Sequence, residues 1–404
     1  MKATSLLFLP CSGFVVVHAF SPSGWMLKRK NLYPSTTARF DNEPALFIDE
    51  THNSVSEYYG KTLSTSDDLK TNACCTAGAP PQHIQDCLSN IHDTVKSKYY
   101  GCGLTIPDEM DGCTVLDLGC GAGRDVYIAS QLVGPKGRVI GVDMTPEQLQ
   151  VATDYQDYHA ERFGYSNTEF YKGFLEQLDE LPLEDNSVDI IISNCVINLC
   201  ADKESVLKSC KRLLKPGGEL YFSDVYASRR VPQTLKDNEV LWGECLSGAL
   251  YWNDFEQLSK KVGFADPRLV EDAPITINND EMKRVIHEAG QGQLEFYSAT
   301  YRLYNLDQLE YDCEDYGQAV IYKGTIPRHP STWYLDKHHC IEANRIFPVC
   351  GNTYHMLKNT RFEPHFDFVG NFDTHFGPFE GCGAKGLPFT QITTTNDQTK
   401  GACC

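Results

Sequence analysis

The sequence predicts an α/β fold in which a doubly wound parallel sheet is followed by a smaller α+β C-terminal domain. Short apolar, β-branched runs alternate with amphipathic stretches between Cys113 and Asp224, as in sheets whose parallel strands are joined by helices. A glycine-rich loop directly follows the first of these runs. Beyond Trp252 the alternation gives way to a mixed pattern, which indicates a second unit.

Four apolar runs have the length and composition of buried strands. The predicted strands are 114–118, 138–142, 188–193 and 219–224. The third, Val-Asp-Ile-Ile-Ile-Ser, is almost continuously apolar, as expected for a strand covered on both faces. We expect the ligand site at the carboxyl ends of these strands.

The stretches between the strands have helical spacing. Helices are predicted at 126–133, 146–163 and 205–214, and the third ends at Lys-Pro-Gly-Gly (215–218). Thr145 is the expected N-cap of the second helix. Further along we expect a helix at 254–262 and strands at 296–303 and 318–323, whereas 328–395 has no clean period.

Composition limits the possible partners. The 404-residue chain has 36 basic and 54 acidic residues, a formal charge of −18. Nucleic acids and anionic membranes need a positive surface, so we expect neither as a partner. Seventeen cysteines, some in the vicinal pairs Cys74–Cys75 and Cys403–Cys404, suggest thiol chemistry more than structural disulfides.

Residues 1–42 have the features of a targeting presequence. A broken apolar stretch (6–20) precedes a basic, hydroxyl-rich segment without an acid before Asp41. The junction Ala19-Phe20 resembles that of bipartite presequences for secondary plastids. We therefore expect a plastid location, with the cytoplasm as the alternative.

The glycine-rich loop is the first candidate ligand site. It reads Asp117-Leu118-Gly119-Cys120-Gly121-Ala122-Gly123, whereas dinucleotide loops space their glycines G-x-G-x-x-G. An acid two residues before the first glycine would repel a pyrophosphate but suits a cofactor that carries an ammonium and a sulfonium. Asp143, at the end of the next strand, is placed to accept both ribose hydroxyls.

These features together resemble the class I S-adenosylmethionine-dependent methyltransferases, which have a Rossmann-like sheet. In that family the stretch 174–178 lies where the adenine is contacted. The resulting candidate cofactor-binding residues are Asp117, Gly119, Cys120, Gly121, Gly123, Asp143, Met144, Leu175, Glu176 and Asn194.

Four cysteine-bearing segments indicate the substrate. They are 67–74, ending in Cys74; 99–103, Tyr-Tyr-Gly-Cys-Gly with Cys102; 193–199, with Cys195; and 241–252, with Cys245. They resemble the corresponding segments of arsenite methyltransferases, and the resemblance extends from about Tyr58 to about Leu303. It weakens after about Lys323.

The resemblance implies a role for each of these cysteines. Cys195 and Cys245 would hold arsenic throughout, with Cys102 as the third ligand. Cys74 would form a disulfide with Cys102 during reduction, and thioredoxin or glutathione would reset that pair. Tyr100 could face the sulfonium as a cation–π partner. The substrate would be arsenite or its thiol conjugates, and we expect a monomer.

The chemistry agrees with that implication. Trivalent arsenic is soft, so thiolates are suitable ligands, and it keeps a lone pair that can attack a methyl group without a general base. Two alternatives stay open: a methyltransferase acting on carbon, nitrogen or oxygen of a metabolite, and a thiol-rich protein that only sequesters arsenicals. Incubation with arsenite, thiol and labelled cofactor separates them.

The predicted division of the chain follows from these assignments. It comprises a presequence (1–42), a methyltransferase domain with a helical lead (43–225), an arsenic-site segment (226–275), a C-terminal α+β domain (276–380) and a flexible cysteine-containing tail (381–404).

Overall fold

The computed structural model describes residues 80–381, apart from residues 100, 102, 237–240, 242–244, 278 and 291. The predicted presequence and all but the first residue of the predicted tail lie outside these residues. So do three predicted site residues, Cys74, Tyr100 and Cys102. Among the described helices, none has both the length and the apolar character needed to cross a bilayer.

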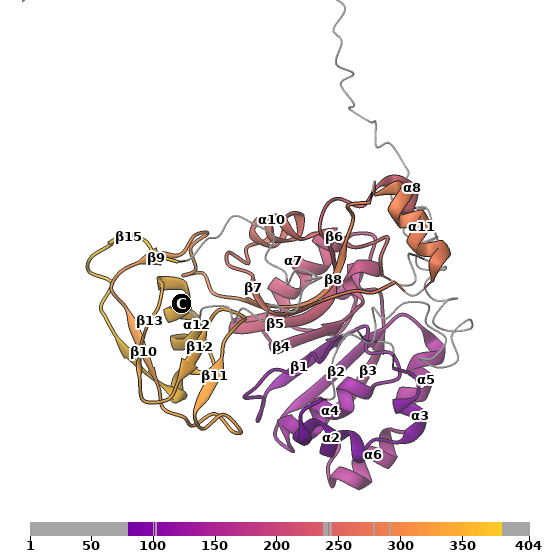
Figure 1. The fold of residues 1–404 in the computed structure, drawn as a ribbon. Coiled ribbons are helices and arrows are strands. Elements are labelled where there is room, and N and C mark those ends of the chain that lie inside the picture. The colour runs from indigo at the N-terminus through magenta and orange to yellow at the C-terminus, as the bar shows by residue number, and fades with distance from the viewer. Residues whose placement is uncertain are drawn as a thin grey trace, which may run out of the picture. The chain divides into compact units, whose positions relative to one another are not determined.

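An eight-stranded sheet forms the centre of the described chain (Figure 1). Its order is β3-β2-β1-β4-β5-β8-β7, with β6 paired to β5. The strands are β1 (Thr114–Leu118), β2 (Arg138–Asp143), β3 (Thr168–Lys172), β4 (Val188–Asn194), β5 (Leu214–Ala227), β6 (Leu250–Tyr251), β7 (Arg268–Pro274) and β8 (Phe296–Tyr304). Strands β1 to β5 are parallel, and β8 is antiparallel to its neighbours β5 and β7. The predicted doubly wound α/β fold is confirmed.

Helices cover both faces of this sheet, as the alternation of side chains along β4 shows. Ile190 and Ile192 pack in one apolar cluster with residues of α4 (Arg124–Val133), whereas Ile191 packs in another with residues of α7 (Lys203–Leu213). Successive strand residues point to opposite faces, so α4 and α7 lie on opposite sides. The continuous apolar run of β4 is explained by this double cover.

The remaining helices of this part of the chain connect and flank the strands. They are α2 (Gln82–Ser89), α3 (Asp93–Lys96), α5 (Pro146–Asp154), α6 (Gln156–Phe163), α8 (Gln233–Lys236), α10 (Trp252–Val262) and α11 (Asp280–Ala289), with 3-10 turns η4 (Leu175–Glu180) and η5 (Ile197–Leu199).

The single helix predicted at 146–163 is wrong, because the structure divides it into α5 and α6 at Tyr155. That residue leaves the helical conformation (φ −102°, ψ 9°). Its ring stacks on His92, with ring centroids 4.0 Å apart, and its hydroxyl donates a hydrogen bond to Thr94 (3.2 Å). These contacts with the N-terminal lead hold Tyr155 outside the helix.

A smaller α+β part follows β8, and we call residues 305–381 the C-terminal region. It contains β9 (Glu314–Asp315), β10 (Ala319–Tyr322), β11 (Thr332–Tyr334), β12 (Cys340–Glu342), β13 (Ile346–Pro348), α12 (Gly351–Lys358), η6 (Glu363–His365), β14 (Phe366–Val369) and β15 (Gly377–Pro378). Trp333 is fully buried in its core. Because β8 pairs with β5 along nine residue pairs, the predicted division at 275–276 lies inside the main sheet.

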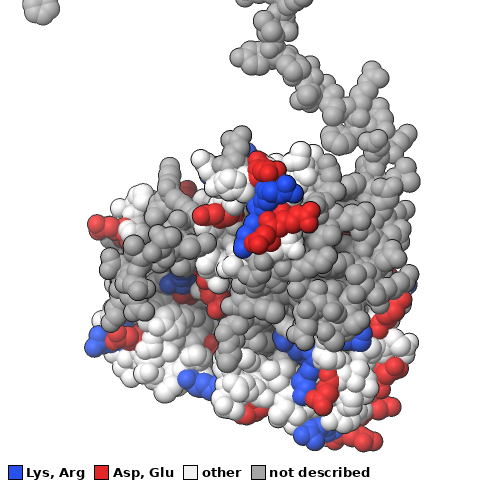
Figure 2. All heavy atoms as spheres, turned by 45° about the vertical axis from the view of Figure 1, so that its right-hand side comes forward, with Lys and Arg blue, Asp and Glu red and all other residues white. Residues whose placement is uncertain are grey.

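The face of the molecule drawn in Figure 2 carries charges of both signs. Figure 2 shows basic side chains in small groups beside acidic ones, and the coloured residues of that face form no continuous basic area. This agrees with the excess of acidic over basic residues in the sequence.

Candidate functional site

A cavity opens at the carboxyl ends of β1, β2 and β4, where the strand order reverses between β1 and β4. Ligands of doubly wound sheets bind at such a point. The predicted cofactor-binding residues that line it are Asp117, Gly119, Cys120, Gly121, Asp143, Met144, Leu175, Glu176 and Asn194. Gly123 does not line the cavity; it is the N-cap of α4, with a left-handed φ of 87°.

The glycine loop has little space for side chains. Gly119 has a φ of 72°, a backbone conformation that residues with a Cβ rarely adopt. A Cβ there would lie 2.5 Å from both γ-carbons of Val196. A Cβ on Gly141 of β2 would lie 2.8 Å from the Cys120 sulfur. Small residues therefore let this loop lie close to β2 and to the loop after β4.

Two buried carboxylates give the cavity its charge. One oxygen of Asp117 has no hydrogen-bond partner among the described residues. Burial, followed by the nearby carboxylates of Asp125 and Asp143, raises the pKa of Asp117 well above its usual value. Burial also raises the pKa of Asp143. Such a site favours a ligand that brings positive charge.

Asp143 also holds the loops around the cavity. Its Oδ2 accepts a hydrogen bond from the Gly121 amide and its Oδ1 from the Thr145 amide, each at 2.8 Å. A carboxylate has about four acceptor positions, so both oxygens can also accept ribose hydroxyls. With the buried Asp117 oxygen, these residues fit S-adenosylmethionine, which carries an ammonium and a sulfonium.

Asn194 fastens an N-terminal segment to the end of β4. Its Oδ1 accepts a hydrogen bond from the Gly103 amide (3.1 Å), and its Nδ2 donates to the Gly103 carbonyl (2.8 Å). The same Nδ2 donates to the Tyr99 hydroxyl (2.7 Å). A Cβ on Gly101 would lie 2.6 Å from the Asn194 side chain. It would also lie 2.2 Å from the Tyr99 hydroxyl, so glycine at 101 lets Tyr99 and Asn194 lie this close to each other.

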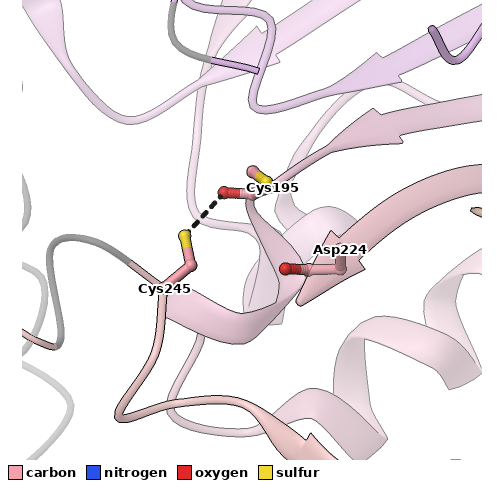
Figure 3. A group of neighbouring side chains, drawn as sticks. All are labelled: Cys195, Asp224 and Cys245. Atoms are coloured by element: carbon pink, nitrogen blue, oxygen red, sulfur yellow. Dashed lines mark hydrogen bonds between the residues drawn. The ribbon is translucent and has the colours of Figure 1, made fainter. Parts of the chain in front are cut away.

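Cys195 and Cys245 meet beside the cavity although 50 positions separate them in the sequence. Their sulfurs and a carboxylate oxygen of Asp224 all lie within 4.8 Å of one another. Figure 3 shows these three neighbouring residues at the end of β4, on β5 and in the loop before β6, with the Cys245 sulfur pointing to the Cys195 carbonyl. The Cys245 thiol donates a hydrogen bond to the Cys195 carbonyl (3.3 Å), so the two loops are in direct contact.

Both cysteines have a left-handed backbone. The φ angle is 58° at Cys195 and 61° at Cys245. Residues other than glycine that adopt this conformation cost roughly 1–3 kcal/mol each and cluster at functional sites. Two strained cysteines in contact therefore point to a site that the fold maintains at the expense of stability.

The oxidation states of these two residues differ. Cys195 is disulfide-bonded, whereas Cys245 and the other described cysteines are thiols. Both members of the predicted Cys74–Cys102 pair lie outside the described residues.

Two family models match the chain. A methyltransferase domain matches residues 109–290, and the arsenite methyltransferase C-terminal domain matches residues 316–404. The arsenite methyltransferase of Aquipseudomonas alcaligenes is 58% identical over 353 residues, which cover 87% of this chain and 100% of the relative. The human arsenite methyltransferase is 46% identical, with 88% of this chain and 94% of the relative covered.

The chain belongs to the arsenite methyltransferase family. A crystal structure of an arsenic(III) S-adenosylmethionine methyltransferase from Chlamydomonas reinhardtii agrees: it matches with a TM-score of 0.71 and 48% identity, covering 75% of this chain and 100% of the other. As a member of the arsenite methyltransferase family, the chain is an S-adenosylmethionine-dependent methyltransferase.

Asp224 also belongs to the thiol site, although the sequence did not predict it as a site residue. Its carboxylate accepts hydrogen bonds from the Asn198 backbone amide (2.9 Å) and the Asn198 side chain (2.7 Å). It thereby fixes the turn that follows Cys195. Burial raises the pKa of Asp224 to about 6. An acid within the apolar run Phe222-Ser223-Asp224-Val225 was the available signal.

Two further residues, Tyr99 and Arg124, line the cavity. Neither was predicted as a site residue from the sequence. The Arg124 guanidinium lies 3.0 Å from the centre of the Tyr99 ring and pairs with Asp125 (2.7 Å). The predicted aromatic residue, Tyr100, lies outside the described residues. Its neighbour in the sequence, Tyr99, is described and lines the cavity.

Proposed function

We propose that this chain transfers methyl groups from S-adenosylmethionine to trivalent arsenic held by the thiolates of Cys102, Cys195 and Cys245. Arsenite would become methylarsenite and then dimethylarsenite. The observation that supports this most is the approach of the Cys195 and Cys245 sulfurs to within 4.8 Å beside the cavity. The family supports the same substrate, because its named members are arsenite methyltransferases.

The proposed chemistry asks the protein to position atoms rather than to move protons. Bound S-adenosylmethionine supplies the activated methyl group. Cys195 lines the cavity, and Cys245 contacts Cys195. Arsenic held by both sulfurs would therefore face the cavity with its lone pair available. Positioning of this kind can contribute roughly 7 kcal/mol or more to lowering a barrier.

The position of Gly103 supports Cys102 as the third ligand. Gly103 follows Cys102 in the chain and is bound at two points to Asn194, the residue before Cys195. Consecutive Cα atoms are about 3.8 Å apart. Two hydrogen bonds thus connect the direct neighbours of two proposed ligands.

The redox part of the proposal concerns Cys74 and Cys102. Methyl transfer oxidises arsenic from the trivalent to the pentavalent state, and formation of a Cys74–Cys102 disulfide returns the two electrons. Thioredoxin or glutathione would then reduce that disulfide.

A complex with a trivalent phenylarsenical tests the ligand assignment. The phenyl group leaves two valences for sulfur, so in the reduced protein we expect arsenic bonded to Cys195 and Cys245. The measurement is a crystal structure of the complex, in which anomalous scattering locates the arsenic. Arsenic bound only to other cysteines, such as Cys200 at the cavity wall, would contradict the assignment.

Replacing Cys74 with serine tests the disulfide cycle. We expect the C74S variant to fail on arsenite while it still methylates methylarsenite, because the first methylation is the step assigned to this redox pair. The measurement is the yield of methylated product from each substrate with the same reductant. Cys75→Ser is the control variant. Equal losses on both substrates in C74S would argue against the assigned role.

A further inference from the structure

The segment after Cys102 connects the thiol site with the C-terminal region. Gly103 is held at the thiol site by Asn194. A few residues later, Asp108 and Glu109 contact side chains of the C-terminal region. Between these points Thr105 is almost fully buried, so the segment is held against the protein at both ends.

Asp108 is the centre of the contacts at the far end. Its Oδ2 accepts a hydrogen bond from the Trp333 indole (3.0 Å), and its Oδ1 lies 3.3 Å from the His329 Nε2. The Arg361 guanidinium donates two hydrogen bonds to the Asp108 carbonyl, at 3.0 and 2.9 Å. Both the side chain and the backbone of Asp108 are thus bound by one region.

A second contact holds the next residue in a strained conformation. Glu109 has a φ of 58°, and its carboxylate lies 3.0 Å from the His365 Nε2. In the C-terminal region, Arg328 also has a positive φ, 71°, and its guanidinium lies 3.8 Å from Asp108. Strain of this kind persists only where surrounding contacts outweigh it.

The side chains that hold Asp108 are themselves fixed. Trp333 has no exposed surface and packs against Phe362, with ring centroids 4.7 Å apart. Arg361 also forms an ion pair with Glu219 of β5, and Glu219 is fully buried and paired with Arg302 of β8 (3.1 Å). The anchor therefore extends into the central sheet and is not a loose surface contact.

We propose that the C-terminal region positions residues 103–109, the segment that directly follows Cys102, with Trp333 and Arg361 as the positioning residues. The inference rests on the proposed function, in which Cys102 is the third arsenic ligand. Asn194 holds this segment at Gly103, and Trp333 and Arg361 hold it at Asp108. The backbone between these two residues therefore has few other positions open to it. Through this segment the C-terminal region would limit where the preceding residue, the proposed third ligand, can bind arsenic.

This role affects the two substrates unequally. Arsenite offers three valences to sulfur, whereas the methyl group of methylarsenite leaves only two. Cys195 and Cys245 suffice for methylarsenite, so a displaced Cys102 impairs arsenite selectively. A general loss of stability would lower the rates with both substrates.

The test uses variants of the full-length chain. Trp333→Phe keeps an aromatic ring but removes the donor to Asp108, and Asp108→Ala removes the acceptor from the segment itself. Tyr316→Phe is the matched control, because it deletes another aromatic-to-carboxylate hydrogen bond of the C-terminal region, to Glu310 (2.9 Å). Each variant is assayed for kcat/KM with arsenite and with methylarsenite. X-ray absorption counts the sulfur ligands of bound arsenite, and Tm confirms folding.

We expect W333F and D108A to lose about tenfold or more in kcat/KM for arsenite, since small misplacements of reacting groups can cost about a hundredfold. Methylarsenite should stay within about twofold of wild type, and the sulfur ligands should fall from three to two. Y316F should match wild type on every measure. Equal losses on both substrates, or three sulfurs in both variants, would overturn the inference and leave the proposed function standing. Wild-type protein without arsenic–sulfur bonds would overturn the proposed function instead.

Discussion

Cys195→Ser is expected to lower kcat/KM for arsenite by roughly a thousandfold or more, because a permanent ligand is lost and with it the positioning of arsenic. A hydroxyl is a poor ligand for soft trivalent arsenic. Serine is close in size to cysteine, so the buried site and the turn fixed by Asp224 should persist. Cys245→Ser should give the same result, since its sulfur lies in the same cluster.

The control is Cys87→Ser, which alters another buried cysteine, on α2, away from the cavity. C87S should keep near-normal turnover. S-adenosylmethionine affinity, measured by calorimetric titration, should be unchanged in C195S and C245S. Normal methylation of arsenite by either variant would remove these two cysteines from the proposed mechanism.

Asp143→Ala is expected to weaken S-adenosylmethionine binding by about 10- to 100-fold, the range for losing a hydrogen-bonded charged group. Two effects combine in this variant. The expected acceptor for the ribose is removed, and the Gly121 and Thr145 amides lose the carboxylate that orients them. The KM for the cofactor and its Kd from titration both measure the loss.

The arsenical site should be unaffected by that change, since Asp143 does not belong to the cluster of Cys195, Asp224 and Cys245. Titration of the reduced D143A apo-protein with a trivalent arsenical should reproduce the wild-type Kd. If arsenical binding weakens in parallel, the variant has disturbed the fold rather than the cofactor site alone. Unchanged cofactor affinity would show that Asp143 has no part in binding.

Local patterns in the sequence were sufficient for the cofactor loop and for β1, β2, β4 and β5 of the central sheet, whereas β3, β6 and β7 were not predicted. The β-branched run of β4 identifies a strand covered on both faces, and the spacing of Gly119 and Gly121 after β1 places the loop at the strand end. Both features depend on neighbours in the chain. The resemblance to a family then directed attention to Cys195 and Cys245, which the fold brings together.

Features that depend on distant contacts were not predictable in this way. The break at Tyr155 results from packing on His92, and the inclusion of β7 and β8 in the main sheet results from pairing with β5. Asp224 is an acid within an apolar run, but only its neighbours in space show that it belongs to the thiol site. The left-handed backbone of both cysteines is likewise set by the loops that meet there.

The buried ion pairs around Glu219 restrict how this chain can be shortened. A chain that stopped after Asn305 would keep Glu219 and Arg302 but lose Arg361, which lies against the same carboxylate. Leaving a buried charge without any partner typically costs about 3–5 kcal/mol; Arg302 would still face Glu219, so the loss of Arg361 would cost less than that. We therefore expect forms truncated before Arg361 to be less stable than the full chain, so a loss of activity in them would not by itself identify a catalytic role of the C-terminal region.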